Sequence, residues 1–150
     1  MSSPLIFRCS QCGAMNRVAL LVSERQAVCG KCKADLDPSG APAQVDLAGL
    51  ERAIASSPVP VLVDFWAPWC APCRAFAPVL ERFAREQPGR YVVLKLDTEA
   101  QEAAAARFGI QAIPTLVVFR DGKEVERASG ALPLEELRRF AAAAAFSVAT

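Results

Sequence analysis

Apolar residues follow two different periods in the second part of the chain, and these predict a strand followed by a helix. Val59–Ala67, with the sequence VPVLVDFWA, is a continuous apolar and β-branched run of the kind expected for a strand buried on both faces. Pro78 predicts a kink in the helix expected at residues 73–86. In that segment the apolar side chains recur at helical spacing, at Phe76, Val79, Leu80 and Phe83.

The remaining periodic segments continue this alternation. Asp121-Gly122 lies between two short β-type runs and is a strong hairpin signal. Further strands are predicted at 91–96, 115–120 and 124–128, and further helices at 47–56, 99–108 and 134–146. The order helix, strand, helix, strand, helix, hairpin, helix predicts an α/β fold, a three-layer sandwich with a mixed central sheet.

A stretch without periodicity divides the chain into two domains. Residues 36–44, LDPSGAPAQ, are rich in Pro, Gly, Ser and Ala, which indicates a linker. We therefore predict a small domain at 1–35 and a larger one at 45–150. A domain below about 40 residues buries too little apolar surface to fold unaided, so it usually needs a metal ion or disulfides.

Composition and charge narrow the class of protein. Of the 150 residues, 53% are hydrophobic and 22% are charged, with a net charge of +1. These values are typical of a globular protein and exclude a disordered tail, a collagen or a strongly basic nucleic-acid binder. The N-terminus has no pattern of a secretory signal, and the longest nearly apolar run, Phe140–Ala149, is too short to span a bilayer. We expect a cytoplasmic protein that binds neither nucleic acid nor membrane.

Six cysteines and no histidine point to sulfur chemistry. The missing histidine excludes Ser/His and Cys/His catalysis and any His-ligated zinc site. In the cytoplasm, clustered cysteines bind metal or perform redox chemistry more often than they form structural disulfides. The six fall into two groups, with four in the predicted small domain and two in the large one.

Cys70 and Cys73 form the group in the large domain, and they lie between the predicted central strand and the following helix. A Cys-x-x-Cys spacing in this position is typical of a redox pair. The helix N-terminus presents unpaired N–H groups and a partial positive charge, which lower the pKa of a thiol there. Cys70, nearer the helix start and expected to be the more exposed, should attack a substrate disulfide, and Cys73 should resolve the mixed disulfide. The alternatives are two buried structural cysteines or half of a zinc site.

The four N-terminal cysteines have the spacing of a zinc ribbon. Two Cys-x-x-Cys pairs are separated by sixteen residues, and together they would supply four thiolates to one tetrahedral, structural Zn²⁺. The ligands would be Cys9, Cys12, Cys29 and Cys32. Gly13 and Gly30 suit tight turns around the sulfurs. Iron in a rubredoxin-like site and redox disulfides are the alternatives. We interpret the excess of basic over acidic residues in this domain as compensation for the charge of the centre.

Several separated motifs in the large domain resemble the thioredoxin family. They are VDFWAPWCAPC at Val63–Cys73, Ile113-Pro114-Thr115 and the Asp121-Gly122 hairpin, and the resemblance covers about residues 45–146. A zinc ribbon ahead of such a domain is similar to the zinc-containing subgroup called thioredoxin 2. Ala71 stands where the usual active-site turn of the family has Gly. Because Ala favours helix over Gly by about 1 kcal/mol, this departure bears on the redox potential rather than on the thiol chemistry.

Asp64 lies within the predicted central strand, where a charge is costly, so its pKa is expected to rise. In the family, the matching acid helps to move the proton of the resolving thiol, here Cys73. The matching lysine, here Lys95, lies near that acid. The alternative is a buried structural ion pair between Asp64 and Lys95.

The resemblance also implies a substrate-binding surface. Pro114 matches a cis-proline that faces the active site, and the backbone of Ile113 would pair with an extended substrate. Phe65 and Trp66 could equally be plain core residues. The surface would comprise Trp69, Ala71, Pro72, Ile113 and Pro114.

Together these residues predict a cytoplasmic protein-disulfide reductase that acts in cell redox homeostasis. The resemblance implies that oxidised cytosolic protein disulfides are its substrates and that a flavin- and NADPH-dependent thioredoxin reductase recharges it. The chain has no GxGxxG motif, so we expect no bound organic cofactor. We expect a monomer with one structural Zn²⁺. A disulfide oxidase or isomerase is one competing function, which Ala71 leaves open. A zinc-ribbon interaction or co-chaperone module is another, against which the intact Cys70/Cys73 pair argues.

Overall fold

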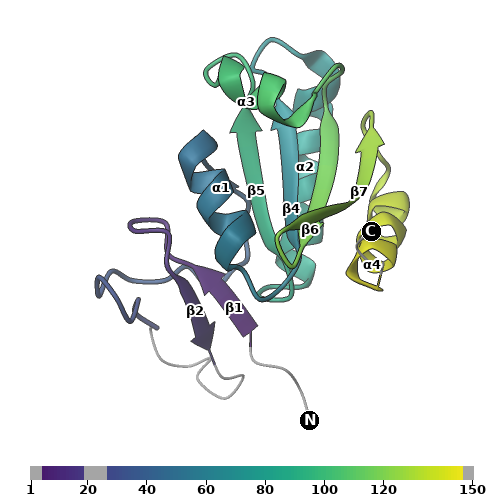
Figure 1. Ribbon diagram of the computed structural model, residues 1–150. Helices are drawn as coiled ribbons and strands as arrows, with labels where there is room; N and C mark the ends of the chain where they lie inside the picture. Colours follow the sequence, from purple (N-terminus) through teal and green to yellow (C-terminus); the bar gives the residue numbers. More distant parts are fainter. Residues whose placement is uncertain (1–4, 19–26, 147–150) are drawn as a thin grey trace.

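The computed structural model describes residues 5–18 and 27–146, which form two packed parts (Figure 1). The smaller part, called the ribbon here, comprises the described residues up to 35. It contains the antiparallel strands β1 (Leu5–Arg8) and β2 (Met15–Val18). The larger part is built on a five-stranded sheet. No helix in the described part of the chain is long and apolar enough to cross a membrane.

The sheet has the strand order β3-β5-β4-β6-β7 and is mixed. Strand β5 runs parallel to both of its neighbours, whereas β4 pairs antiparallel with β6, and β6 with β7. The predicted mixed sheet is therefore confirmed. The strands are β3 (Ala43–Gln44), β4 (Val61–Trp66), β5 (Val92–Asp97), β6 (Thr115–Arg120) and β7 (Lys123–Ser129).

Helices cover both faces of this sheet and enclose two apolar cores. Buried residues of α1 and α3 pack with Val63, Phe65, Leu94 and Leu96 on one face. Buried residues of α2 and α4 pack with Leu62, Val93, Leu116 and Val118 on the other. This arrangement confirms the predicted three-layer α/β sandwich. The helices are α1 (Leu47–Ser56), α2 (Ala71–Glu86), α3 (Glu102–Phe108) and α4 (Leu134–Phe146).

Most predicted elements are present, with shifts at some ends that side-chain capping explains. Helices α1 and α4 have the predicted bounds. Helix α2 begins at Ala71 rather than at residue 73, because the Cys70 side chain caps its first turn. Helix α3 begins at Glu102 rather than at residue 99, because the Asp97 carboxylate accepts hydrogen bonds from two following backbone amides and holds a turn there. In the hairpin, Asp121 and Gly122 have φ of 54° and 80°, as a tight two-residue turn requires.

Three short strands were not predicted from the sequence. Strands β1 and β2 form the ribbon sheet, and β3 lies at the end of the predicted linker, where it pairs with β5. At the other end of this segment, the Leu36 side chain is 2% exposed and packs in the ribbon. Residues 36–44 therefore make defined contacts at both ends.

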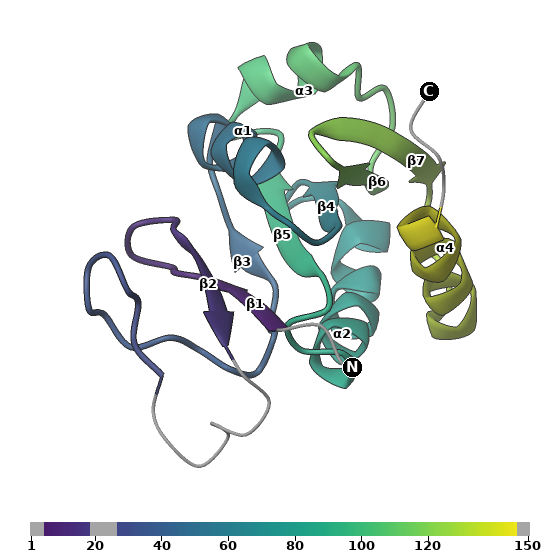
Figure 2. The same cartoon turned by 60° about the horizontal axis from the view of Figure 1, so that its bottom comes forward.

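The ribbon packs against the sheet domain at the edge formed by β3 (Figure 2). Ile6 of β1 belongs to the same core as Leu50 and Val92, and its N–H donates to the Gly89 carbonyl at 3.0 Å. Gly89 has φ +81°, and a Cβ at this position would lie 2.5 Å from the Leu5 Cβ. The close approach of β1 therefore requires glycine at position 89.

Candidate functional site

The Cys70–Cys73 pair lies at the junction between β4 and α2 and forms a disulfide. Cys70 is the N-cap of α2, and its Sγ accepts a hydrogen bond from the Cys73 N–H at 3.2 Å. Pro72 occupies the first turn, where its missing N–H is not needed. The Cys70 residue is 4% exposed and Cys73 is 2% exposed, so exposure hardly distinguishes them. What distinguishes them is position, because the Cys70 sulfur receives the amide at the helix N-terminus.

The peptide bond Ile113–Pro114 is cis, and it lies beside the disulfide. The Ile113 carbonyl oxygen is 3.9 Å from the Cys70 Sγ, and the Ile113 side chain packs with both cysteines. The Pro114 carbonyl accepts from the Gly130 N–H at 2.8 Å. The sequence motif thus brings residues of α2 and of the segment before β6 together at one site.

Exposed side chains surround the disulfide. The Trp69 residue is 66% exposed, and Ala71 and Pro72 are also exposed, although the cysteines between and beside them are buried. An exposed tryptophan next to a buried reactive pair offers apolar contact area to a binding partner. Of the five residues predicted as substrate-binding surface, these three are exposed, Ile113 is half-buried and Pro114 is buried.

Asp64 of β4 is fully buried, and neither carboxyl oxygen has a hydrogen-bond partner among the described residues. Burial raises the pKa of Asp64 to about 7, and the positive charge of Lys95 opposes this rise. Lys95 is the residue paired with Asp64 on β5, but its ammonium lies over the Trp66 ring, 4.5 Å from the centroid. Among the described residues, no close ion pair joins Asp64 to Lys95.

The four N-terminal cysteines converge on one point. Their sulfurs all lie within 4.8 Å of one another, with Cys9 and Cys32 at 3.6 Å and Cys12 and Cys29 also at 3.6 Å. A tetrahedral ion with metal–sulfur bonds of about 2.3 Å holds its sulfurs roughly 3.8 Å apart. This geometry can hold a metal ion. The Cys32 N–H is the main cause that lowers the pKa of Cys29. Although a hydrogen bond from the Ala34 N–H lowers the pKa of Cys32, burial and the neighbouring cysteine thiols outweigh it, and this pKa is raised.

Two similar turns, called knuckles here, carry these sulfurs. In the first, the Gly13 N–H donates to the Cys9 carbonyl at 2.8 Å, and in the second the Lys33 N–H donates to the Cys29 carbonyl at 2.9 Å. Gly13 and Lys33 both have positive φ, at 79° and 68°. Gly30 lies within the second turn, as predicted, although its φ is not positive. Its N–H donates to Asn16 Oδ1 at 2.9 Å.

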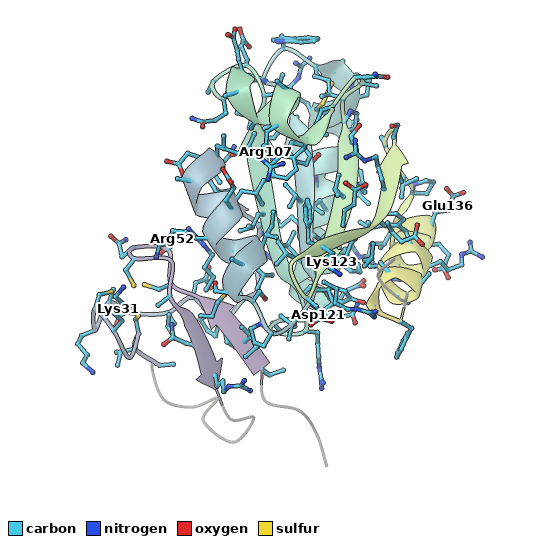
Figure 3. The ribbon with its side chains drawn as sticks, viewed as in Figure 1. Lys31, Arg52, Arg107, Asp121, Lys123 and Glu136 are labelled. Atoms are coloured by element: carbon cyan, nitrogen blue, oxygen red, sulfur yellow. A yellow bond between two sulfur atoms is a disulfide. The ribbon has the colours of Figure 1, made fainter. Side chains whose placement is uncertain are left out.

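Arg52 of α1 contacts the first knuckle, and nothing in the sequence indicated this contact. Its Nη2 donates to the Cys12 carbonyl at 2.8 Å, and Figure 3 shows Arg52 on the side of α1 that faces the ribbon. Its guanidinium lies so close to Gly13 that a Cβ there would be 3.3 Å from three of its atoms. Burial, followed by the charge of Arg52, lowers the pKa of the neighbouring Arg8. The basic residues near the four-cysteine cluster therefore include Arg52, which comes from the larger part of the molecule.

Trp66 and Gln44 are two further residues whose place the sequence did not reveal. Trp66, which could have been plain core, is only half-buried and carries the Lys95 ammonium on its ring. Its indole N–H donates to Gln44 Oε1 at 3.3 Å. Gln44 lay in the predicted linker, and only the pairing of β3 with β5 brings it to the site.

Comparison with known proteins identifies the relationship that this site suggests. The thioredoxin family profile matches residues 41–143. Thioredoxin C-3 from Corynebacterium nephridii is 41% identical over 140 residues, which cover 91% of this chain and 92% of that protein, so the similarity extends into the ribbon. Thioredoxin 1 from Nostoc sp. is 44% identical over 93 residues, which cover 62% of this chain and 87% of that protein.

Solved structures agree with these sequences. A mutant thioredoxin from Halobacterium salinarum superposes with a TM-score of 0.66 at 30% identity, covering 75% of this chain and 97% of that one. Chloroplastic thioredoxin z gives a TM-score of 0.65 at 33% identity, covering 69% of this chain and 94% of that one. The chain, a thiol-disulfide oxidoreductase, therefore belongs to the thioredoxin family.

Proposed function

We propose that the chain is a cytoplasmic protein-disulfide reductase that works through the Cys70/Cys73 dithiol. The observation that supports this most directly is the position of the Cys70 sulfur, which caps the N-terminus of α2 beside the cis Ile113–Pro114 bond. The Cys73 amide and the helix dipole would stabilise a Cys70 thiolate once the disulfide is reduced. Reduced Cys70 is therefore the attacking group.

The reaction transfers two electrons in two exchanges. The Cys70 thiolate attacks one sulfur of the target disulfide, a mixed disulfide forms, and the second target sulfur leaves as a thiolate that takes a proton from water. Cys73 then loses its proton, and its thiolate attacks the Cys70 sulfur. The first target sulfur leaves as a thiolate that takes a second proton from water, and the Cys70–Cys73 disulfide forms. The target gains two electrons and two protons in total.

Asp64 is the group we assign to the proton of Cys73, with Lys95 as the neighbouring charge. A carboxyl that is fully buried without a hydrogen bond, and whose pKa is about 7, can exchange a proton near neutral pH. The chain has no histidine, so no imidazole can do this. The family resemblance implies that Asp64 is the proton acceptor when Cys73 attacks, and this pKa supports the assignment.

The substrate would bind across the exposed surface around the disulfide. Trp69, with Ala71 and Pro72, would supply apolar contact, and Pro114 would face the bound segment. The Ile113 backbone, whose carbonyl is near the Cys70 sulfur, would pair with an extended peptide. The targets are oxidised cytoplasmic proteins, and the family implies a thioredoxin reductase that returns the disulfide to the dithiol.

The four N-terminal cysteines are proposed to bind one structural Zn²⁺ and to define a ribbon domain at 1–35, joined by residues 36–44 to the thioredoxin domain at 45–150. Cys9, Cys12, Cys29 and Cys32 offer four thiolates and no open position, which fits a structural centre. Zinc would supply folding free energy to a part whose apolar cluster around Phe7 and Leu36 is too small to fold it unaided. Metal analysis of the purified chain tests this. A chain that contains no bound metal and has all four N-terminal cysteines as free thiols would contradict it.

The reduction of insulin by dithiothreitol tests the reductase activity. Wild type should accelerate insulin precipitation, and Cys70→Ser should abolish the acceleration. Cys73→Ser should retain attack but fail to resolve, so it should trap mixed disulfides from a lysate. A wild-type rate no higher than background would contradict the reductase, and failure of Cys73→Ser to trap mixed disulfides would contradict the order of attack.

A further inference from the structure

Three polar residues form a row across neighbouring strands of the sheet. Gln44 on β3 is paired with Lys95 on β5, and Lys95 is paired with Asp64 on β4. Paired residues of parallel strands point to the same face, so the three side chains lie on one face. Trp66 follows Asp64 by two positions and shares this face. Figure 2 shows the strands β3, β5 and β4 side by side.

Contacts within this polar row are made through the tryptophan rather than directly. The Lys95 ammonium lies over the Trp66 ring at 4.5 Å from its centroid, and the indole N–H donates to Gln44 Oε1 at 3.3 Å. Asp64, although next to Lys95 in the row, keeps both carboxyl oxygens without a hydrogen bond among the described residues. Lys95 and Trp66 are half-buried and Gln44 is exposed, whereas Asp64 is fully buried. The opposite charge of the buried carboxyl would ordinarily attract a flexible lysine beside it.

Other groups near Asp64 do not replace Lys95 as its charged neighbour. The residue paired with Asp64 on the other side is Leu116 of β6, which is apolar. Cys73 of the overlying α2 is held in the disulfide and does not titrate. Asp97, on the same face of β5, accepts hydrogen bonds at Oδ1 from backbone amides of the turn that follows it. Burial is the larger cause of the raised pKa of Asp64, and Lys95 is the charged group that opposes it.

We propose that Gln44 and Trp66 are positioning residues that hold the Lys95 ammonium over the indole ring and away from the Asp64 carboxyl. Gln44 fixes the indole through its N–H, and the face of the ring binds the ammonium by a cation–π contact. Held in this way, Lys95 cannot pair closely with Asp64 and stabilise its anion. Asp64 consequently keeps its affinity for a proton near neutral pH. The proposal rests on the role of Asp64 as proton acceptor for Cys73.

Two variants release the ammonium in different ways. Gln44→Met keeps the length of the side chain but removes the acceptor for the indole N–H, and Trp66→Leu removes the ring. In both, Lys95 is free to approach Asp64, so the pKa of Asp64 should fall. An opposite charge within about 4–6 Å lowers a carboxyl pKa by about one pH unit or more, and we expect this for Trp66→Leu and a smaller fall for Gln44→Met.

Carbon-13 NMR of the Asp64 carboxyl in the oxidised, full-length chain measures this directly. A titration from pH 4 to 10 gives the pKa of Asp64 in wild type and in each variant. A pKa that stays constant or rises in Trp66→Leu would overturn the proposal. Oxidised protein is used so that Cys73 does not titrate in the same range.

The same two variants made in a Lys95→Met background show whether a fall in the pKa of Asp64 is caused by Lys95 or by water that enters the site. Removing the ring could admit water and lower the pKa of Asp64 without Lys95. In Lys95→Met the ammonium is absent, so Gln44→Met and Trp66→Leu should no longer change the pKa of Asp64. An equal fall in the Lys95→Met background would show that water is the cause and would overturn the positioning role.

The proton-transfer role of Asp64 is tested separately, by the rate at which Asp64→Asn resolves a mixed disulfide formed with a small disulfide substrate. An unchanged rate would remove that role while leaving the titration as it is. If Gln44→Met and Trp66→Leu leave the pKa of Asp64 unchanged, while Asp64→Asn resolves the mixed disulfide slowly, only the positioning role is contradicted. The two failures are therefore distinguishable.

Discussion

Replacing Asp64 with Asn should remove a pH-dependent loss of stability that the buried carboxyl imposes. Burial raises the pKa of this group from 3.8 to about 7, against the opposing charge of Lys95. Below pH 3.8 the carboxyl is protonated in both the folded and the unfolded chain, so it carries no penalty. Between the two pKa values the folded chain binds the proton and the unfolded chain does not. The free energy of unfolding must therefore fall as pH rises, until the loss is complete above pH 7.

The size of the loss follows from the same values. A pH unit between the two pKa values corresponds to about 1.4 kcal/mol, so a rise from 3.8 to about 7 corresponds to roughly 4 kcal/mol. Asp64→Asn has no proton to bind or lose. At pH 8 it should therefore be the more stable protein by up to roughly 4 kcal/mol, less the cost of burying an amide without a partner, about 1–3 kcal/mol.

Urea unfolding of the oxidised proteins at pH values from 4 to 9 tests this expectation. The informative quantity is the difference in free energy of unfolding between Asp64→Asn and wild type. Other titrating groups, including the N-terminal cysteines, contribute equally to both proteins, so they cancel in the difference. This difference should rise from pH 4 to about 7 and then become constant. A difference that is independent of pH would refute the reasoning, because it would show that Asp64 titrates alike in the folded and unfolded chains.

Two glycines allow matched tests of close packing at the ribbon. Gly13→Lys should displace the Arg52 guanidinium and lower the free energy of unfolding by about 1–3 kcal/mol. The control Lys33→Gly should change it by less than about 1 kcal/mol. If Gly13→Lys costs as much in an Arg52→Ala background, the displaced contact is not the cause. Gly89→Ala should cost about 3 kcal/mol or more, because it adds a clash with β1 to an unfavourable φ, and Gly122→Ala, with the same φ and no neighbour within 4 Å, should cost only about 1–2 kcal/mol. Similar losses for Gly89→Ala and Gly122→Ala, measured by chemical denaturation, would argue against tight packing of β1 on Gly89.

The elements that the sequence predicts well are those whose pattern is local and long. Strand β4 is a continuous apolar run, and α1 and α4 have apolar residues at helical spacing. The type of each of these elements can therefore be predicted from its own residues. Strands β1, β2 and β3 have four, four and two residues. Too few positions exist in such a strand to show alternation. These strands form because each pairs with another strand, and no pattern within their own few residues indicates that pairing.

Candidate site residues divide in the same way. Cys70 and Cys73, and the two cysteine pairs of the ribbon, were found because their chemistry depends on a fixed spacing along the chain. The cis-proline and the roles of Asp64 and Lys95 came from family resemblance. Gln44 and Trp66 were missed as site residues because their contact depends on the register of β3 against β5, which is set by tertiary packing.

The turn at the first knuckle explains only part of why position 13 is glycine. From the sequence, a glycine after the second cysteine of a pair is explained by the turn, which needs positive φ. The equivalent position in the other knuckle is Lys33, which adopts φ +68° without being glycine. Positive φ alone therefore does not require glycine here. What differs between the knuckles is the guanidinium of Arg52, which lies against Gly13 and donates to the Cys12 carbonyl. A Cβ at position 13 would press on this guanidinium at 3.3 Å, so contact with α1, as well as the turn, favours glycine here.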